Sequence, residues 1–201
     1  MISANAELLS RETDPSEWLD NIRYENDRMG DLVTQLLELS RAENAQPDPE
    51  QLDLSRLVTG EVLPFESVAF ERGMTIKSDI AEGIMIEGNR PRLSQLVSIL
   101  LDNAVRHSGG GEIVLALREQ GKNAVLTVEN SGGEIPPDKL ERLFERFYRV
   151  DGSRNSEGGH YGLGLAIARA VAEAHGGCIS AASGDGKVVF TVSLPLKGCK
   201  K

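Results

Sequence analysis

One stretch of the chain combines a glycine-rich loop with a helix start, and it reads GGHYGLGLAIARAVAEAHGG over residues 158–177. A helix N-terminus carries unpaired N–H groups and a partial positive charge, so its usual guest is an anion such as a phosphate. The pattern is not a dinucleotide fingerprint, because no predicted strand precedes it and Ile167 occupies the place of the third glycine. When this stretch is considered alone, a flexible connection is the favoured interpretation.

A second stretch reads LLDNAVRH over residues 100–107 and ends a predicted helix. Asn103, Arg106 and His107 lie three and four residues apart, so they share one polar face. An amide oxygen is a hard ligand that suits Mg²⁺, which takes few protein ligands and keeps water and phosphate oxygens. A helix brace and a solvated arginine are the alternative interpretation.

Two further stretches are weaker signals by themselves. Residues 128–137, VENSGGEIPP, end a predicted strand in a turn with two glycines, where a planar group could approach and Asn130 could hydrogen bond to its edge. Residues 140–149, LERLFERFYR, hold aromatic side chains that could anchor a loop, with Arg149 and Arg154 reaching towards phosphates. An ordinary surface turn and core aromatics are the alternatives.

The elements that must position these residues follow from hydrophobic periodicity. The predicted helices are 55–72, 91–107 and 163–175, and the predicted strands are 51–54, 74–80, 84–87, 112–118, 124–129, 178–182 and 188–194. Strands in hairpins with a few long helices on one face predict an α+β fold, a two-layer sandwich.

Residues 1–45 differ from the rest of the chain and predict two helices. The second follows an N-cap and a first-turn proline in the stretch 14–17 and ends at about Arg41. The apolar stripes are Ile2, Ala6 and Leu9 on the first helix and Ile22, Met29, Val33, Leu36 and Leu37 on the second. Such a hairpin needs a partner, either a second copy of itself or the body of its own chain. Pro47 and Pro49 then indicate a linker.

Composition bounds the function. The chain has 201 residues, of which 40 % are apolar and 26 % are charged, and its formal net charge is −9. Nucleic-acid binding is therefore not expected, because phosphate backbones need clustered lysine and arginine. Cys178 and Cys199 have no metal-ligand spacing, so we expect two reduced thiols and a cytoplasmic setting.

The four motifs together resemble a known family. In chain order, DNAVRH, ENSGGEIPP, ERLFERFYR and YGLGLAIA resemble the N, first glycine, F and second glycine boxes of sensor histidine kinases, which belong to the GHKL ATPase superfamily. The resemblance covers about residues 47–197 and includes a third glycine element at 184–186. It implies a GHKL-type mixed sheet covered by helices on one face. It also implies a partial dimerisation and phosphotransfer hairpin at 1–45 and a catalytic ATP-binding domain at 46–201.

The resemblance implies a site for ATP and Mg²⁺. Asn103 would ligate Mg²⁺ that bridges the phosphates, Asn130 would face the adenine amino group, and residues 149–161 would form a lid over the nucleotide. The implied ATP-binding residues are Asn103, Arg106, His107, Asn130, Gly132, Ile135, Tyr148, Arg149, Arg154, Tyr161, Gly162, Leu163, Gly164 and Leu165.

Three residues depart from the family pattern. Asn130 replaces a frequent aspartate, so its neutral oxygen would accept from adenine while its own NH₂ needs another partner. Glu134 stands where a glycine is usual, and Ile99 replaces a second asparagine one helical turn before Asn103. We expect a working but divergent ATP site.

The phospho-accepting histidine of the family lies in a segment resembling HELRTPL, shortly before the residues that match 2–5 here. His107, His160 and His175 all lie in or near the ATP-binding part, so no catalytic residue is assigned. We expect a truncated piece of a longer, membrane-anchored sensor. The intact protein would dimerise through its hairpin and phosphorylate a histidine, which then passes the phosphate to an aspartate of a response regulator receiver domain.

Two rival functions stay open at this point. One is a degenerate GHKL domain that acts as a non-catalytic dimerisation or docking module. The other is a GHKL protein that phosphorylates serine on a partner, which the hairpin disfavours.

Overall fold

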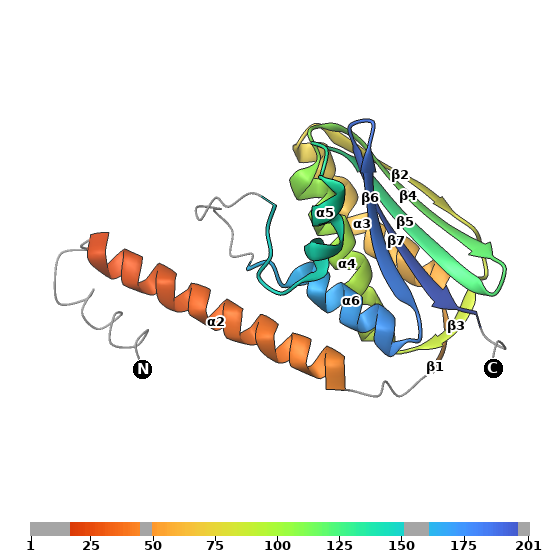
Figure 1. Cartoon of the computed structure of the whole chain (residues 1–201), viewed down its shortest axis with the longest axis horizontal. Helices are drawn as coiled ribbons and strands as arrows, with labels where there is room; N and C mark the ends of the chain where they lie inside the picture. The colour runs from red at the N-terminus through yellow and green to blue at the C-terminus, as the bar shows by residue number, and fades with distance from the viewer. Residues whose placement is uncertain (1–16, 45–49, 151–160, 197–201) are drawn as a thin grey trace.

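A five-stranded sheet covered by helices on one face forms the body of the computed structural model, which describes residues 17–44, 50–150 and 161–196 (Figure 1). The sheet has the order β2-β4-β5-β7-β6, and only β2 and β4 run parallel. Its strands are β2 (Met74–Ile80), β4 (Gly111–Gln120), β5 (Asn123–Ser131), β6 (Cys178–Gly184) and β7 (Lys187–Pro195). The predicted two-layer α+β sandwich with a mixed sheet is confirmed.

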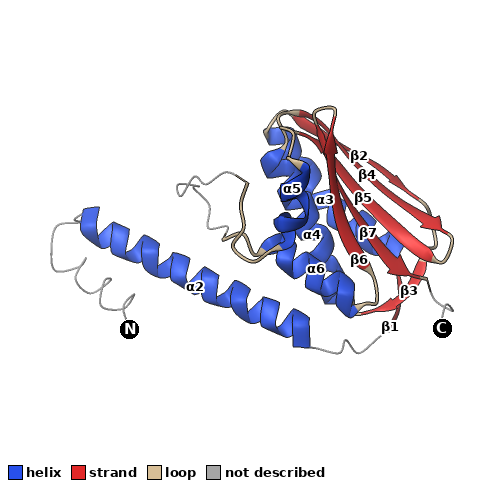
Figure 2. Cartoon of the chain, viewed as in Figure 1, coloured by secondary structure: helices blue, strands red, loops and turns tan. Residues whose placement is uncertain are grey.

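The remaining elements are a two-stranded ribbon and the helices. Strands β1 (Glu50–Asp53) and β3 (Met85–Gly88) pair as a separate antiparallel ribbon. The helices are α2 (Glu17–Asn44), α3 (Leu54–Glu71), α4 (Arg90–His107), α5 (Pro137–Leu140), the 3₁₀ turn η1 (Glu141–Phe144) and α6 (Gly164–Ala174). Figure 2 shows α3, α4 and α6 on one side of the strands.

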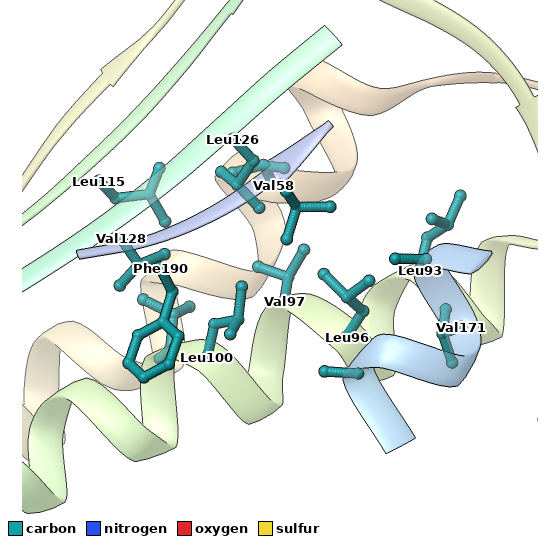
Figure 3. Packing of buried hydrophobic residues seen from close by; sticks show 14 of the residues in the cluster. Val58, Leu93, Leu96, Val97, Leu100, Leu115, Leu126, Val128, Val171 and Phe190 are labelled. Carbon is teal, nitrogen blue, oxygen red and sulfur yellow. The ribbon is translucent and has the colours of Figure 1, made fainter. Parts of the chain in front are cut away.

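Helix α4 lies at the centre of the core. The side chain of its N-cap residue, Asn89, accepts a hydrogen bond from the backbone N–H of Arg92 at 3.1 Å, which satisfies a donor that the helix itself leaves open. Its buried side chains are Leu93, Leu96, Val97, Leu100, Leu101, Ala104 and Val105. Figure 3 shows several of them among Val58 of α3, Val171 of α6 and apolar residues of the sheet.

The observed elements match the predicted ones except for shifts of one to three residues at their ends and in the respects that follow. Helix α3 begins at Leu54, because the Asp53 side chain accepts from the backbone N–H of Arg56 at 3.0 Å and so ends β1. Strand β2 does not pair within a hairpin, since the chain crosses over through α4 and returns as β4 parallel to it. Helices α5 and η1 were not predicted, because each is only one turn long.

Helix α2 packs on the body of its own chain, but not through its predicted stripe. Leu39 and Ala42 are buried against the body, and Gln95 of α4 donates a hydrogen bond to Glu38 at 2.9 Å. The predicted stripe, Ile22, Met29, Val33, Leu36 and Leu37, is exposed. The two faces of α2 are thus distinct, and dimerisation through the exposed face stays a prediction.

Several predictions on residues 1–45 lie outside the described residues. These are the first helix with Ile2, Ala6 and Leu9, the N-cap at 14–16 and the linker and domain boundary within 45–49. In the part of the chain that the structure describes, every helix is too short or too polar to cross a membrane.

His175 joins the end of α6 to the start of α4. Its Nδ1 lies 2.7 Å from the carbonyl oxygen of Val171, and its Nε2 accepts a hydrogen bond from the backbone N–H of Asn89 at 3.0 Å. The neutral ring therefore donates through Nδ1 and accepts through Nε2. Gly88 leaves the room for this ring, because a Cβ atom there would lie 2.7 Å from Cδ2 of His175.

Acid should weaken this connection, and we predict a pH-dependent loss of stability. Burial lowers the pKa of His175 below its ordinary value of 6.5, with the charge of Arg92 acting in the same direction and the Val171 carbonyl opposing it. The folded chain then binds fewer protons than the unfolded chain, so the contribution of His175 is present above pH 6.5 and falls as the pH drops towards the folded pKa.

The measurement is the free energy of unfolding by urea between pH 5 and pH 8. His175→Ala should cost about 1 kcal/mol at pH 8 and flatten the slope in this window. Asn123→Ala, at the exposed start of β5, is the control and should retain the slope, because it removes no titratable group. A slope that is identical in wild type and His175→Ala would contradict the prediction.

Candidate functional site

The last two turns of α4 carry the first group of predicted site residues. Asn103 is half-buried, and no hydrogen bond among the described residues uses its amide. Arg106 is exposed, and its Nε lies 2.9 and 2.8 Å from the two carboxylate oxygens of Asp102. His107 is exposed at the end of the helix. Arg106 thus already has an acidic partner, which sequence analysis missed although Asp102 stands four residues before it.

Residue spacing on α4 connects Asn103 to two other motifs. Ile99, Asn103 and His107 are four residues apart and therefore lie on one face of the helix. If Gly164 carried a Cβ atom, that atom would lie 3.4 Å from the Ile99 side chain. A Cβ atom on Gly132 would lie 3.2 Å from the His107 carbonyl oxygen. Asn103 consequently stands between the start of α6 and the turn that follows β5.

Asn130, at the end of β5, is one of the few buried polar residues, with 2 % of its surface exposed. Its Nδ2 donates a hydrogen bond to the carbonyl oxygen of Ser131 at 2.9 Å. Among the described residues no hydrogen bond uses its Oδ1. The NH₂ group thus has the partner that the sequence left unidentified, and the oxygen stays available as an acceptor.

The turn after β5 is tied to the end of α4. The backbone N–H of Gly109 donates to the carbonyl oxygen of Ser131 at 3.0 Å, and the hydroxyls of Ser108 and Ser131 lie 3.0 Å apart. Gly132 donates its N–H to the carbonyl oxygen of Gly186 at 2.9 Å. This bond brings the predicted third glycine element to the same place.

A side chain at position 132 would meet close neighbours, whereas position 134 accepts one. A Cβ on Gly132 would lie 3.4 Å from Nδ2 of Asn130, in addition to the close His107 carbonyl. Glu134 is exposed and is not among the residues with positive φ, so its backbone accepts a side chain. Ile135 follows with its N–H donated to the Ser183 hydroxyl at 2.9 Å, a contact that no local pattern indicates.

The start of α6 presents backbone N–H groups without a side-chain cap. Its N-cap residue is Leu163, which is apolar, fully buried and makes no capping hydrogen bond. Gly164 and Leu165 are half-buried in the first turn. An N-terminus of this kind favours an anion.

Gly162 and the segment after η1 are held together. The N–H of Phe147 donates to the carbonyl oxygen of Gly162 at 3.0 Å, and φ of Gly162 is +71°. A Cβ on Gly162 would lie 2.8 Å from the carbonyl oxygen of Tyr148. The Tyr148 ring is covered by the Arg142 guanidinium, whose Cζ is 4.3 Å from the ring centroid.

The other predicted residues lie apart from this centre or beyond the description. Arg149 is exposed, and Arg154 lies outside the described residues. The Tyr161 hydroxyl donates to the backbone carbonyl of Arg28 on α2. The structure thus brings Asn103, His107, Asn130, Gly132 and Gly164 around one face of α4, and the role of all the predicted residues in ATP binding stays a prediction.

A surface cavity of about 780 Å³ lies elsewhere, between the end of α2, the segment around η1 and the outer face of α6. Its lining includes Ala42, Phe144, Ala166 and Arg169, and no residue predicted to bind the nucleotide lines it. It is therefore a feature of the packing of α2 on the body.

Comparison with known proteins gives one family and many relatives. Residues 88–198 match the family described as histidine kinase-, DNA gyrase B-, and HSP90-like ATPase. The chain is 33 % identical over 200 residues to the sensor protein DltS of Streptococcus agalactiae, covering 98 % of this chain and 50 % of that protein. It is 40 % identical over 185 residues to the sensor histidine kinase TrcS of Mycobacterium tuberculosis, covering 89 % and 36 %. The chain thus spans half or less of these relatives.

Solved structures share the fold. The Acinetobacter baumannii histidine kinase AdeS matches with a TM-score of 0.74 at 23 % identity, covering 98 % of this chain and 94 % of that one. Full-length ShkA in complex with AMPPNP matches with a TM-score of 0.78 at 24 % identity, covering 97 % and 42 %.

Replacing Gly162 by alanine should destabilise the protein. The substitution forces a side chain into positive φ, and its Cβ would lie 2.8 Å from a backbone oxygen that cannot move independently. We predict a loss of about 1–3 kcal/mol in the free energy of unfolding, measured by urea denaturation. Gly133→Ala is the matched control, because no atom lies within 4 Å of its Cβ position and its φ is not positive. Equal stability of the two variants would show that the close approach at Gly162 is absent.

Proposed function

Because this chain belongs to the histidine kinase-, DNA gyrase B- and HSP90-like ATPase family, as the catalytic ATP-binding portion of a sensor histidine kinase, we propose that it binds ATP together with Mg²⁺ and supplies the γ-phosphoryl group that phosphorylates a histidine. The phosphate then passes to an aspartate of a response regulator. The intact protein acts as a dimer and is a membrane-anchored sensor, of which this chain is a cytoplasmic part.

One observation carries the proposal: the face of α4 that holds Asn103 links the start of α6 to the turn beside Asn130. The uncapped N-terminus of α6 suits the phosphates. At the other end, Gly132 lacks the side chain that would close the approach to Asn130, whose unused Oδ1 suits the adenine amino group. The nucleotide would lie along α4, with its base near β5 and its phosphates near α6.

The residues present fit a magnesium ion. The Asn103 amide is half-buried, unused within the described residues and placed between the proposed base and phosphate ends. A single amide oxygen suffices, because Mg²⁺ keeps most of its shell as water and phosphate oxygens. Ile99 offers no second ligand, because its side chain is a hydrocarbon; it lies beside Gly164 at the start of α6. When bound, Mg²⁺ neutralises charge on the transferring phosphates.

The chain's own contribution is to bind and orient. Backbone N–H groups at the start of α6 hold phosphate oxygens, and the turn at Gly132 receives the base. Phosphoryl transfer depends mostly on such positioning and on neutralisation of charge, because the imidazole of the acceptor supplies the nucleophile.

Three features support the partner assignments. Relatives over almost the whole chain are named as sensors and sensor histidine kinases. Helix α2 retains an exposed apolar stripe, from Ile22 to Leu37, of the kind that pairs with a second copy. The net charge of −9 argues against a nucleic-acid partner.

The test of this function is MgATP binding measured by calorimetry, with Asn103→Ala as the central variant. We expect wild type to bind MgATP, and Asn103→Ala to lose most of the magnesium-dependent part of the affinity, roughly tenfold. With ATP labelled at the γ position, a separate helical hairpin that carries the HELRTPL-type segment should acquire acid-labile phosphate.

Asn123→Ala, at the exposed start of β5, is the matched control and should bind as wild type does. No heat of binding in wild type would favour the rival function, a non-catalytic dimerisation or docking module. Binding without transfer to histidine would separate nucleotide binding from kinase activity. Transfer to serine instead would support the other rival.

Asn130→Asp should tighten nucleotide binding and weaken the fold at the same time. A carboxylate is a stronger acceptor for the adenine amine by about 1 kcal/mol, which corresponds to roughly fivefold in affinity. The same carboxylate loses the hydrogen bond to the Ser131 carbonyl. It would also place a charge at a position with only 2 % of its surface exposed, so the free energy of unfolding should fall.

The two measurements are MgATP calorimetry and urea denaturation without nucleotide. Asn123→Asp introduces the same change at the exposed start of β5 and should alter neither value by more than a small amount. A variant at position 130 that is less stable but binds MgATP with unchanged affinity would show that this side chain does not face adenine.

A further inference from the structure

Tyr161 directly precedes the glycine residues that lead into α6, yet its side chain contacts α2. Its hydroxyl donates a hydrogen bond to the backbone carbonyl of Arg28. The Arg28 guanidinium also lies over its ring, with Cζ 5.8 Å from the ring centroid. Two contacts of different kinds therefore join this tyrosine to one residue of α2.

Arg28 is itself held in place by its neighbours on α2. Its Cζ lies 5.7 Å from the centroid of the Tyr24 ring, and its Nη1 lies 2.9 Å from a carboxylate oxygen of Glu25. A guanidinium within about 6 Å of an aromatic centroid is attracted to the face of the ring. We call Tyr24, Arg28 and Tyr161 the arginine clasp.

The backbone that follows Tyr161 has little freedom to absorb a displacement. Gly162 has a positive φ and lies against Tyr148, and its carbonyl oxygen accepts from the N–H of Phe147. Leu163 is fully buried, and its carbonyl oxygen accepts from Ile167 at 2.9 Å within the first turn of α6. A change at Tyr161 is therefore transmitted over very few residues to the N–H groups at the start of α6.

We propose that Arg28 is a positioning residue for nucleotide binding, which acts through Tyr161 to hold the backbone N–H groups of residues 162–165 in the arrangement that receives phosphate. This inference rests on the proposed function and adds a residue of α2 to its machinery. Because binding couplings are reciprocal, bound MgATP also strengthens the docking of α2 on the body.

A second anchor makes the clasp testable without detaching α2. The C-terminal half of the helix is held by the buried residues Leu39 and Ala42 and by the bond from Gln95 to Glu38. Arg28 is partly exposed, with 36 % of its side-chain surface accessible, and alanine is the best helix former. Arg28→Ala should therefore retain the fold.

The experiment measures MgATP affinity by calorimetry for four forms of the full chain: wild type, Arg28→Ala, Tyr161→Ala and the double variant. Arg28→Ala should weaken binding about two- to fivefold, the range expected for loss of an exposed cation–π contact. In the Tyr161→Ala background the same change should have no further effect, since Arg28 acts through that ring. Arg41→Ala, at the other end of α2, is the matched control and should bind as wild type does.

Hydrogen exchange without nucleotide provides a second readout. Amides of residues 161–167 should exchange faster in Arg28→Ala than in wild type and Arg41→Ala, and equal exchange overturns the inference. If wild type binds MgATP and Arg28→Ala binds it with equal or higher affinity, the inference is wrong and the proposed function stands. If Arg28→Ala weakens MgATP binding as much in the Tyr161→Ala background as in wild type, Arg28 acts by another route and the inference is also wrong. Absence of binding in wild type removes both.

Discussion

The burial of α4 is the constraint on which the rest of the site depends. Its apolar residues are enclosed by α3, α6 and the sheet, with Leu100, Leu101 and Ala104 fully buried. Rotating the helix would expose that surface, at a cost of about 25 cal/mol for each Å² of apolar area. The orientation of Asn103 is therefore determined by residues that have no part in chemistry. The helix face at 99, 103 and 107 is directed towards the start of α6 and the turn after β5.

Close backbone approaches hold the other parts against this helix. At Gly162 the start of α6 meets the segment after η1 at a distance that a side chain would prevent. At Gly132 the turn after β5 meets the end of α4 more closely than most side chains allow. Hydrogen bonds of Gly109, Gly132 and Phe147 fix these approaches. The glycines thus serve less as flexible joints than as places where packing is unusually tight.

Helix α2 has separate faces for separate contacts. One face packs on the body through Leu39 and Ala42, and another leaves the stripe from Ile22 to Leu37 exposed. Docking on its own chain and pairing with a second copy therefore do not compete for the same side chains. A movement of α2 would reach the proposed nucleotide site through the contacts of Tyr161 with Arg28 and through the hydrogen bond from Gln95 to Glu38.

Local patterns in the sequence determined most element positions, the mixed α+β class and the four motifs, because periodicity, caps and glycine placement act over a few residues. Contacts between distant segments could not be predicted in this way. The parallel pairing of β2 with β4, the Ser131 partner of Asn130, the Ser183 contact of Ile135 and the reach of Tyr161 to Arg28 follow from how the layers pack. The sequence thus identifies which residue types occur at the site. Their partners were decided by the tertiary structure, because a hydrogen bond or ring contact requires a distance that only the packed core sets.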